Sequence, residues 1–328
     1  MFTALVIDEK DGKVTPSIQT FAEDQLPAGE VTLEAQYSTL NYKDGMVLNG
    51  IGKLVRSYPH VPGVDVAGIV RDSSDSRFSP GDEVLVGGYR FGEIRWGGYS
   101  QLVRVPADWI VRMPSGLSLF HAMAFGTAGF SAMLAVDILE HHGMKPSERE
   151  VLVTGAVGGV GSIAVALLAA LGYNVAASTG RPEEGQYLRH LGANTIIERS
   201  ELETAASRPL ERERWGGCID NVGGSTLGHV LSQLGMGASI ASVGLAGGST
   251  FTANVMPFLL RGVNILGVDS VSLEINKRAQ VWQRLAEVFP LGLLESMTTE
   301  VRLEDLERLG NEILQGRVKG RIVVDVHG

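Results

Sequence analysis

The chain has 328 residues, of which 44% are hydrophobic and 20% charged, a composition typical of a globular protein with large cores. Its formal charge of -9 argues against nonspecific binding to nucleic acid or to an anionic membrane, because both need a positive surface. With a single cysteine, Cys218, the chain can form neither an intrachain disulfide nor a multi-cysteine zinc site.

The first ten residues predict a strand and not a signal peptide, because Asp8 and Glu9 interrupt them before any apolar h-region. The most apolar run, residues 163–171, is about half as long as a membrane-spanning helix. We therefore expect a cytoplasmic protein that binds neither membranes nor nucleic acid.

The first third of the chain predicts an irregular, mostly β domain. Short apolar segments bounded by turns indicate strands at residues 3–7, 31–37, 66–71, 83–86 and 100–105. Between them lie turn-forming pairs such as Pro62-Gly63 and Pro80-Gly81.

From residue 126 onward, strands alternate with helices. Helices are expected at 126–139 and 162–171, and strands at 151–154, 174–178, 195–197, 218–220, 239–243 and 265–268. This alternation is typical of a parallel, doubly wound sheet. Helices near 275–288 and 304–315 and a strand at 321–326 are expected to rejoin the first domain. We predict an α/β fold in which a mostly β domain, 1–125 completed by 271–328, accompanies a doubly wound domain, 126–270.

The strongest local signal is the segment 151–161, where a strand runs through a glycine-rich turn into a helix. Gly158 and Gly161 fill two of the three glycine positions of G-x-G-x-x-G, and Ala156 stands at the first. Amides at such a helix start point at a pyrophosphate, and glycines let it come close. We expect cofactor contacts from Ala156, Val157, Gly158, Gly159, Val160 and Gly161. A glycine-rich turn without a ligand is the alternative.

The end of the second strand of this domain favours NADP, bound as NADPH, over NAD. NAD sites carry an acidic residue there to hold the ribose 2′-hydroxyl. This chain instead has Ser178, Thr179, Gly180 and Arg181. A guanidinium pairs bidentately with phosphate oxygens, which suits a 2′-phosphate. The alternative is an ordinary solvated arginine, and the glutamates at 183 and 184 would have to point away from the phosphate.

Several motifs together resemble the medium-chain dehydrogenase/reductase superfamily. They occupy residues 41–44, 62–68, 80–84, 96–99, 126–130 and 151–161 in the order and spacing of that superfamily. Within it, the chain resembles the zinc-independent quinone oxidoreductase branch and its acrylyl-CoA reductase (NADPH) subfamily, also at residues 263–271 and 316–321. The resemblance implies a GroES-like catalytic domain beside a Rossmann domain, and a homodimer.

No catalytic zinc is expected. Zinc-dependent members carry a Gly-His-Glu turn and an upstream cysteine ligand, whereas this chain has Gly63-Val64-Asp65 and, upstream, Lys43-Asp44. None of the seven histidines has metal-ligand spacing with a suitable partner.

The resemblance also implies site residues. It places Tyr42 beside the nicotinamide and the substrate, where the phenol could orient the ring or donate a hydrogen bond, with packing under a loop as the alternative. Asn41 and Asp44 would fix that loop or contact the cofactor. Further cofactor contacts are expected where loops follow strands and near the C-terminus, at Arg199, Leu245, Asp269, Ser270 and Lys319.

The activity that the resemblance implies is reduction of acrylyl-CoA to propionyl-CoA, with hydride added to the β-carbon. Basic residues such as Lys53, Arg56 and Arg90 are candidates for the phosphates of CoA, although each could be ordinary surface charge. An NADPH-dependent quinone or enone reductase is the alternative enzyme. A non-catalytic nucleotide- or RNA-binding relative is the third hypothesis, and the acidic composition disfavours RNA.

Overall fold

The computed structural model describes residues 1–328, and the chain divides into two compact units. Unit 1 comprises Met1–Thr127, Ser270–Glu287 and Leu294–Gly328, and unit 2 comprises Ala128–Asp269 and Val288–Leu293. The sequence placed all of residues 271–328 with the first domain. The structure differs at Val288–Leu293, because this turn packs with unit 2.

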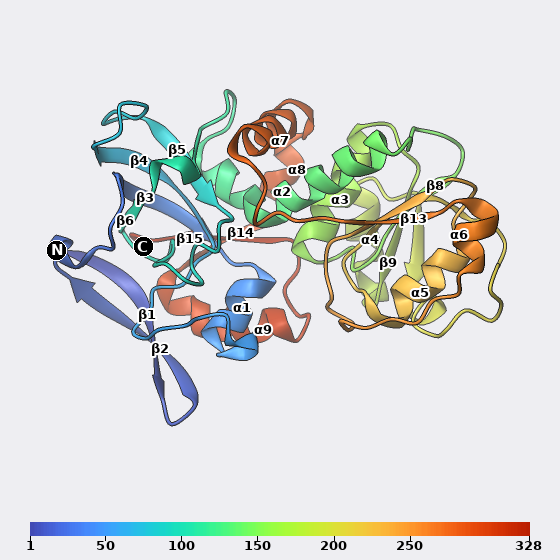
Figure 1. Ribbon diagram of the computed structural model, residues 1–328, viewed down its shortest axis with the longest axis horizontal. Helices are drawn as coiled ribbons and strands as arrows, with labels where there is room; N and C mark the ends of the chain where they lie inside the picture. The colour runs from blue at the N-terminus through green and yellow to red at the C-terminus, as the bar shows by residue number, and fades with distance from the viewer. The chain divides into compact units, whose positions relative to one another are not determined.

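Unit 1 is mostly β. Its strands are β1 (Phe2–Lys10), β2 (Lys13–Phe21), β3 (Val31–Thr39), β4 (Asp65–Ser73), β5 (Glu83–Gly87), β6 (Leu102–Val105), β7 (Ile110–Arg112), β14 (Thr298–Arg302) and β15 (Arg321–Asp325). The sheet runs β14-β15-β3-β4-β5-β7, with β6 also paired to β3 and a separate β1–β2 hairpin (Figure 1). Val31, Leu33 and Ala35 of β3 point into the core on one face of the sheet. Thr32, on the other face, is also buried, whereas Glu34 is exposed.

Helices and turns complete unit 1 around this sheet. The helix α1 (Tyr42–Leu48) follows β3, and α9 (Leu306–Leu314) precedes β15. In the C-terminal stretch, α7 (Ile275–Val288) belongs to unit 1 except for its last residue, and α8 (Leu291–Ser296) passes from unit 2 into unit 1. The sequence did not predict β2, β7, β14, α1 or α8. The strand β2 was missed because it carries mostly exposed, polar residues and so lacks an apolar alternation.

Unit 2 is a doubly wound sheet. Its strands are β8 (Glu150–Val153), β9 (Val175–Thr179), β10 (Thr195–Glu198), β11 (Trp215–Asp220), β12 (Ser239–Ser242) and β13 (Asn264–Gly267), and its helices are α3 (Gly159–Ala170), α4 (Gly185–His190), α5 (Gly224–Gln233) and α6 (Met256–Arg261). All strands are parallel, in the order β10-β9-β8-β11-β12-β13. The chain order therefore reverses between β8 and β11, the point where such sheets bind ligands.

The long helix α2 (Leu119–His141) is a core helix. It has the length and hydropathy to cross a membrane, but 83% of its most apolar window is buried inside the protein. Gly126 interrupts the helix with φ 50° and ψ -157°, a backbone conformation that suits glycine alone. The helix starts seven residues before the predicted position of 126, because the segment before Gly126 is also helical.

A buried polar network at the centre of unit 1 joins elements that are distant in sequence. Arg321 of β15 donates to the Ala124 carbonyl at 2.8 Å, to the Thr39 hydroxyl at 2.6 Å and to the Asn41 amide oxygen at 3.3 Å. Asp65 of β4 accepts from the Asn41 amide at 2.8 Å. Burial lowers the pKa of Arg321 to about 10, and the two neighbouring carboxylates oppose that shift.

Gly126 is required beside this network for a steric reason as well. A Cβ at this position would lie 2.6 Å from the Thr39 methyl group, 3.0 Å from an Arg321 guanidinium nitrogen and 3.0 Å from an Asp65 oxygen. None of these atoms can move without breaking a hydrogen bond of the network or its packing.

Substitution Gly126→Ala is expected to lower the thermal midpoint by several degrees, because it adds steric overlap to roughly 1–3 kcal/mol of backbone strain. Gly116→Ala is the matched control, since Gly116 also has a positive φ but nothing within 4 Å of the added Cβ. Calorimetry of both variants measures the effect. Equal losses in the two variants would show that the network does not restrict position 126.

Candidate cofactor and active site

The glycine loop connects β8 to α3 at the carboxyl edge of the unit 2 sheet. Gly155 takes the left-handed conformation with φ 59°, and Gly158 caps α3. A Cβ at Gly161 would lie 2.3 Å from the Gly155 carbonyl oxygen, so only glycine fits. The first intrahelical bond runs from the Ser162 amide to the Gly158 carbonyl, and the amides before it keep no helical acceptor. The loop thus fits a dinucleotide pyrophosphate.

Two side chains that the sequence analysis missed support this loop from beneath. The Ser162 hydroxyl lies 3.2 Å from the Ala156 carbonyl and 3.1 Å from the Val157 carbonyl. The Tyr187 hydroxyl donates to the Ser162 oxygen at 2.9 Å, which ties α4 to the loop. No spacing in the sequence indicates this contact, because it joins residues 25 positions apart through side chains alone.

A buried carboxylate holds the two loops that border the reversal of strand order. Asp220, at the end of β11, accepts from the Thr154 hydroxyl at 2.6 Å and from the Gly223 amide at 2.9 Å. The Asn221 side-chain amide donates to the Thr154 carbonyl at 2.8 Å. Burial raises the pKa of Asp220, and these hydrogen bonds oppose the shift. The loops after β8 and β11 are therefore fixed to one another.

The residues expected to select the 2′-phosphate lie beside the glycine loop. The Ala156 amide donates to the Ser178 carbonyl at 3.0 Å, which joins the loop to the end of β9. The Arg181 amide donates to the Thr179 hydroxyl at 2.9 Å in a tight turn. A Cβ on Gly180 would lie 2.7 Å from the guanidinium carbon of Arg199, so this second arginine covers the same turn.

Arg199 follows β10 and is exposed, with Glu203 3.2 Å from its guanidinium. Exposed pairs of this kind contribute little energy, so the guanidinium can exchange this partner for a phosphate. Leu245 is 58% exposed in the loop after β12, and Asp269 is exposed after β13. The carboxyl edge of unit 2 thus collects all of the expected cofactor residues that belong to this unit.

The expected residues of unit 1 divide into an exposed and a buried group. Tyr42 is 41% exposed at the start of α1, while Asn41, which caps the helix, is buried. Asp44 is fully buried and accepts from the Asn41 and Val64 amides, both at 2.9 Å. Burial and the Asp65 charge raise the pKa of Asp44 to about 7. Asp44 therefore faces the buried network, and Tyr42 presents its side chain to solvent.

Two further unit 1 residues complete the expected set. Ser270 is half-buried, and its carbonyl accepts from the Arg278 guanidinium at 2.7 Å. Lys319 is exposed just before β15.

No group of three or more His, Cys, Asp or Glu side chains is arranged to hold a metal ion. Cys218 is buried within β11, and burial raises the pKa of its thiol well above the ordinary value.

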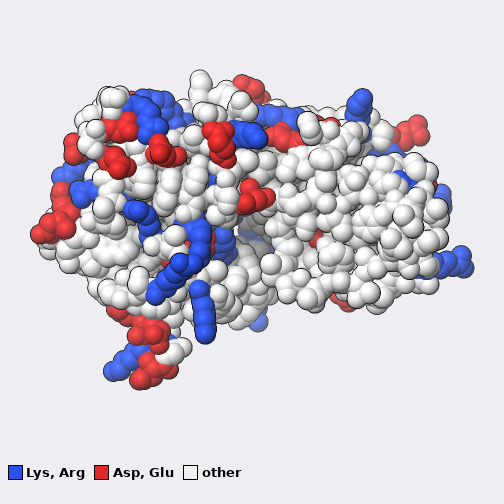
Figure 2. All heavy atoms as spheres, viewed as in Figure 1, with Lys and Arg blue, Asp and Glu red and all other residues white.

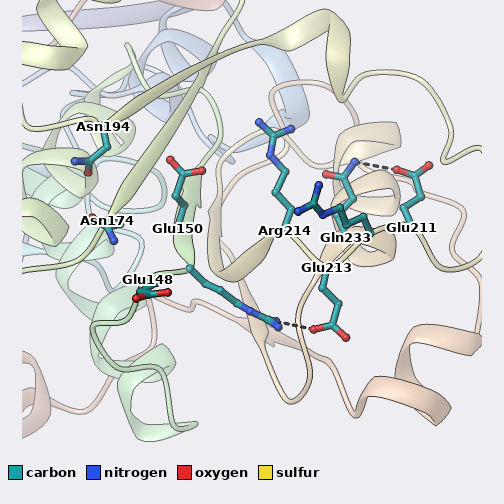
Figure 3. A pocket seen from close by; sticks show the side chains of 10 residues that line it. Glu148, Glu150, Asn174, Asn194, Glu211, Glu213, Arg214 and Gln233 are labelled. Carbon is teal, nitrogen blue, oxygen red and sulfur yellow. Dashed lines mark hydrogen bonds and ion pairs between the residues drawn. The ribbon is translucent and has the colours of Figure 1, made fainter.

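A cavity of about 730 Å³ in unit 2 is lined by residues at the amino ends of the strands, at the opposite edge of the sheet, and Figure 3 shows the side chains that line it. Its lining includes Glu150 at the start of β8, Asn174 just before β9 and Arg214 just before β11. Among the lining residues, Arg149 and Glu213 form an ion pair of 2.7 Å, marked in Figure 3 by the dashed line at Glu213. Since ligands of such sheets bind at the carboxyl edge, this cavity is not the cofactor site.

Comparison with known proteins identifies the family. Residues 27–115 match the alcohol dehydrogenase GroES-like domain, and residues 159–287 match the family described as zinc-binding dehydrogenase. The acrylyl-CoA reductase AcuI of Ruegeria pomeroyi is 54% identical over 100% of this chain and 100% of its own length. The predicted fold class, a GroES-like domain with a Rossmann domain, is thus confirmed.

Solved structures with the same fold contain dinucleotides. The yhdH oxidoreductase of Salmonella enterica, in complex with NADP, has 47% identity and a TM-score of 0.96 over 98% of this chain and 99% of its own. The putative quinone oxidoreductase YhfP of Bacillus subtilis is 43% identical over 99% of this chain and 98% of its own length. A structure of yhfP with NAD bound has a TM-score of 0.95, covering 99% of each chain. The chain therefore belongs to the medium-chain dehydrogenase/reductase superfamily of oxidoreductases, in the group that includes the acrylyl-CoA reductase AcuI and the quinone oxidoreductase-like YhfP.

Proposed function

We propose that the protein is an NADPH-dependent reductase that converts acrylyl-CoA to propionyl-CoA. The observation that carries the proposal is the carboxyl edge of unit 2, where the glycine loop lies beside Arg181 and Arg199. The full-length similarity to an acrylyl-CoA reductase supports the choice of substrate. We assign substrate chemistry to residues 1–125 with 271–328 and most of the cofactor binding to 126–270, a division that the two compact units support except at Val288–Leu293.

Each group of residues has a role in this proposal. The loop from Ala156 to Gly161 holds the cofactor pyrophosphate through those of its backbone amides that have no acceptor in the protein, at Gly159, Val160 and Gly161, since the Ala156 and Gly158 amides already donate to backbone carbonyls. Arg181 and Arg199 hold the 2′-phosphate. When bound, NADPH supplies the hydride that adds to the β-carbon of the thioester, and a proton that comes from water completes the saturated product at the α-carbon. Negative charge then develops on the carbonyl oxygen, where a preorganised donor lowers the barrier.

Tyr42 is the proposed donor or nicotinamide contact, because its side chain is exposed at the start of α1. Asn41 and Asp44 are positioning residues, since the Asp44 carboxylate accepts from the Asn41 amide and fixes the first turn of α1. Leu245, Asp269, Ser270 and Lys319 are proposed as further cofactor contacts. No catalytic zinc is needed in this scheme, because the conjugated thioester is already activated toward hydride.

A quinone or enone reductase is the second candidate, favoured by the similarity to the putative quinone oxidoreductase YhfP. Both reactions use the same cofactor geometry and add hydride to a conjugated acceptor. A nucleic-acid partner is disfavoured by the formal charge of -9. The proposed location is the cytoplasm.

We also propose a homodimer formed through the open edge of the unit 2 sheet. The strand β13 ends the sheet, with an unpaired edge. Just before it, Val255, Leu259 and Leu260 are 58%, 71% and 54% exposed, and the face over α5 and α6 carries few charges (Figure 2). A two-fold axis brings the same surface of both subunits together, so this apolar patch and open edge would be buried against their own copies.

The activity is tested by following NADPH oxidation with acrylyl-CoA, crotonyl-CoA and a quinone panel. We expect kcat/KM for acrylyl-CoA to exceed that for the quinones by at least about tenfold, and a chelator to leave it unchanged. Comparable turnover of quinones with weak turnover of the thioester would instead support the second candidate. Inactivation by the chelator that zinc reverses would contradict the assignment without a metal.

Substitution Arg181→Ala is expected to raise the Kd of NADPH by about tenfold or more, because a charge-assisted hydrogen bond contributes about 1.5–3 kcal/mol. The Kd of NADH should change by less than about twofold, since NADH lacks the 2′-phosphate. Fluorescence titration measures both constants without substrate. An equal loss for the two cofactors would show that Arg181 does not read the phosphate.

Substitution Leu259→Lys is expected to convert the dimer to a monomer in light scattering, because it places a charge in the apolar patch. Met1→Lys, expressed behind an N-terminal tag, is the matched control, since Met1 is also an exposed apolar side chain, at 80%, but belongs to unit 1. A wild-type protein that is monomeric at micromolar concentration, or a Leu259→Lys variant that remains dimeric, would overturn this interface.

A further inference from the structure

A cluster of two cations around one buried carboxylate lies on unit 1, close to Tyr42 in the sequence. The Lys43 ammonium lies 3.0 Å from one oxygen of Glu93, and the Arg90 guanidinium lies 3.4 Å from the other. The side chain of Glu93 is 5% exposed, whereas those of Lys43 and Arg90 are 35% and 36% exposed. The Glu93 carboxylate is therefore buried, whereas Lys43 and Arg90 are partly exposed to solvent.

The cluster has an excess of positive charge and of hydrogen-bond donors. One carboxylate against two cations leaves a formal charge of +1. An ammonium offers three donors and a guanidinium five, and Glu93 accepts only one from each side chain. Three exposed arginines elsewhere on unit 1 show the opposite ratio: Arg71, Arg77 and Arg308 each lie beside two carboxylates.

The loop that carries Arg90 is held rigidly. Tyr89 and Arg90 both have left-handed backbone conformations, with φ of 51° and 59°. The Tyr89 amide donates to the Val271 carbonyl at 2.9 Å, and the Tyr89 ring stacks on Trp109 with 5.5 Å between centroids. The Arg278 guanidinium covers the Tyr89 ring at 4.8 Å. Such contacts maintain a strained backbone, so the Arg90 side chain starts from a preorganised position.

Phosphate is the ligand that this arrangement fits. Two cations that share a rigid support and keep free donors can bind phosphate oxygens with charge-assisted hydrogen bonds. Lys53 and Arg56, the other candidates from the sequence, have no carboxylate that orients them. The phosphates of the cofactor have their own amides and arginines on unit 2. The phosphates of the substrate therefore remain for Lys43 and Arg90.

We propose that Lys43 and Arg90, oriented by Glu93, form a subsite for a phosphate group of the CoA part of the substrate. The subsite rests on the proposed function for its substrate, but its binding can be measured without turnover. It would let the enzyme distinguish a CoA thioester from the same acyl group on a short, uncharged thiol.

The test compares acrylyl-CoA with acrylyl-N-acetylcysteamine, which lacks the phosphates. The variants are Lys43→Met, which keeps an unbranched side chain, and Arg90→Gly, which suits the left-handed backbone at this position. We expect the preference for the CoA ester, expressed as the ratio of kcat/KM values, to fall about tenfold in each variant. Lys13→Met is the matched control, because Lys13 is exposed in the β1–β2 hairpin, and it should keep the wild-type ratio.

Two outcomes would overturn the subsite. If kcat/KM falls equally for both thioesters, the cluster does not recognise phosphate. If fluorescence titration shows that the variants lose affinity for NADPH, the phosphate belongs to the cofactor. Titration calorimetry measures the affinity for free CoA, which needs no turnover. It therefore tests the subsite even if the protein does not reduce acrylyl-CoA. Binding by the wild type that weakens about tenfold in both variants supports the subsite even without acrylyl-CoA reduction, and equal binding by all three proteins contradicts it.

Discussion

The arrangement of β3, α1 and α2 in unit 1 depends on the hydrogen bonds of the buried Arg321 guanidinium. Its partners come from the end of β3, from the cap of α1 and from the first half of α2, and Asp65 of β4 lies in the same network. A buried charge costs several kcal/mol unless its donors are satisfied, so these elements must meet in one arrangement. The start of α1, where Tyr42 is exposed, is thereby placed by residues almost 280 positions away.

In unit 2, a buried carboxylate holds separate segments of the chain together. Asp220 is buried beneath the carboxyl edge, and its hydrogen bonds to Thr154 and to the backbone after β11 join two loops that border the strand reversal. The glycine loop itself contains few side chains, so it needs such support to keep its amides in place. Ser162 and Tyr187 stabilise the same loop, because the Ser162 hydroxyl lies against the Ala156 carbonyl and accepts from the Tyr187 hydroxyl.

The sequence predicted the elements that follow from local patterns of apolar and turn residues. It missed the features that depend on contacts between residues distant in sequence. The strands near 151–154 and 195–197 and the glycine loop follow from apolar runs and turn residues, and the structure contains them. The hairpin strand β2 and the helix α1 were missed, because β2 is largely exposed and α1 is short and contains Gly45. Glu93 was missed because its partner Lys43 lies 50 positions away, and no periodicity links the two residues.

The charge of the whole chain and the charge of the cluster around Glu93 act over different distances. At about 0.1 M salt, the Debye length is about 10 Å, so the net charge of -9 repels a polyanionic ligand only near the surface. A direct contact with Lys43 or Arg90 is shorter than this length and is screened much less. An acidic protein can therefore hold a polyanion through a few cations, provided that buried carboxylates such as Glu93 orient these cations before the ligand arrives.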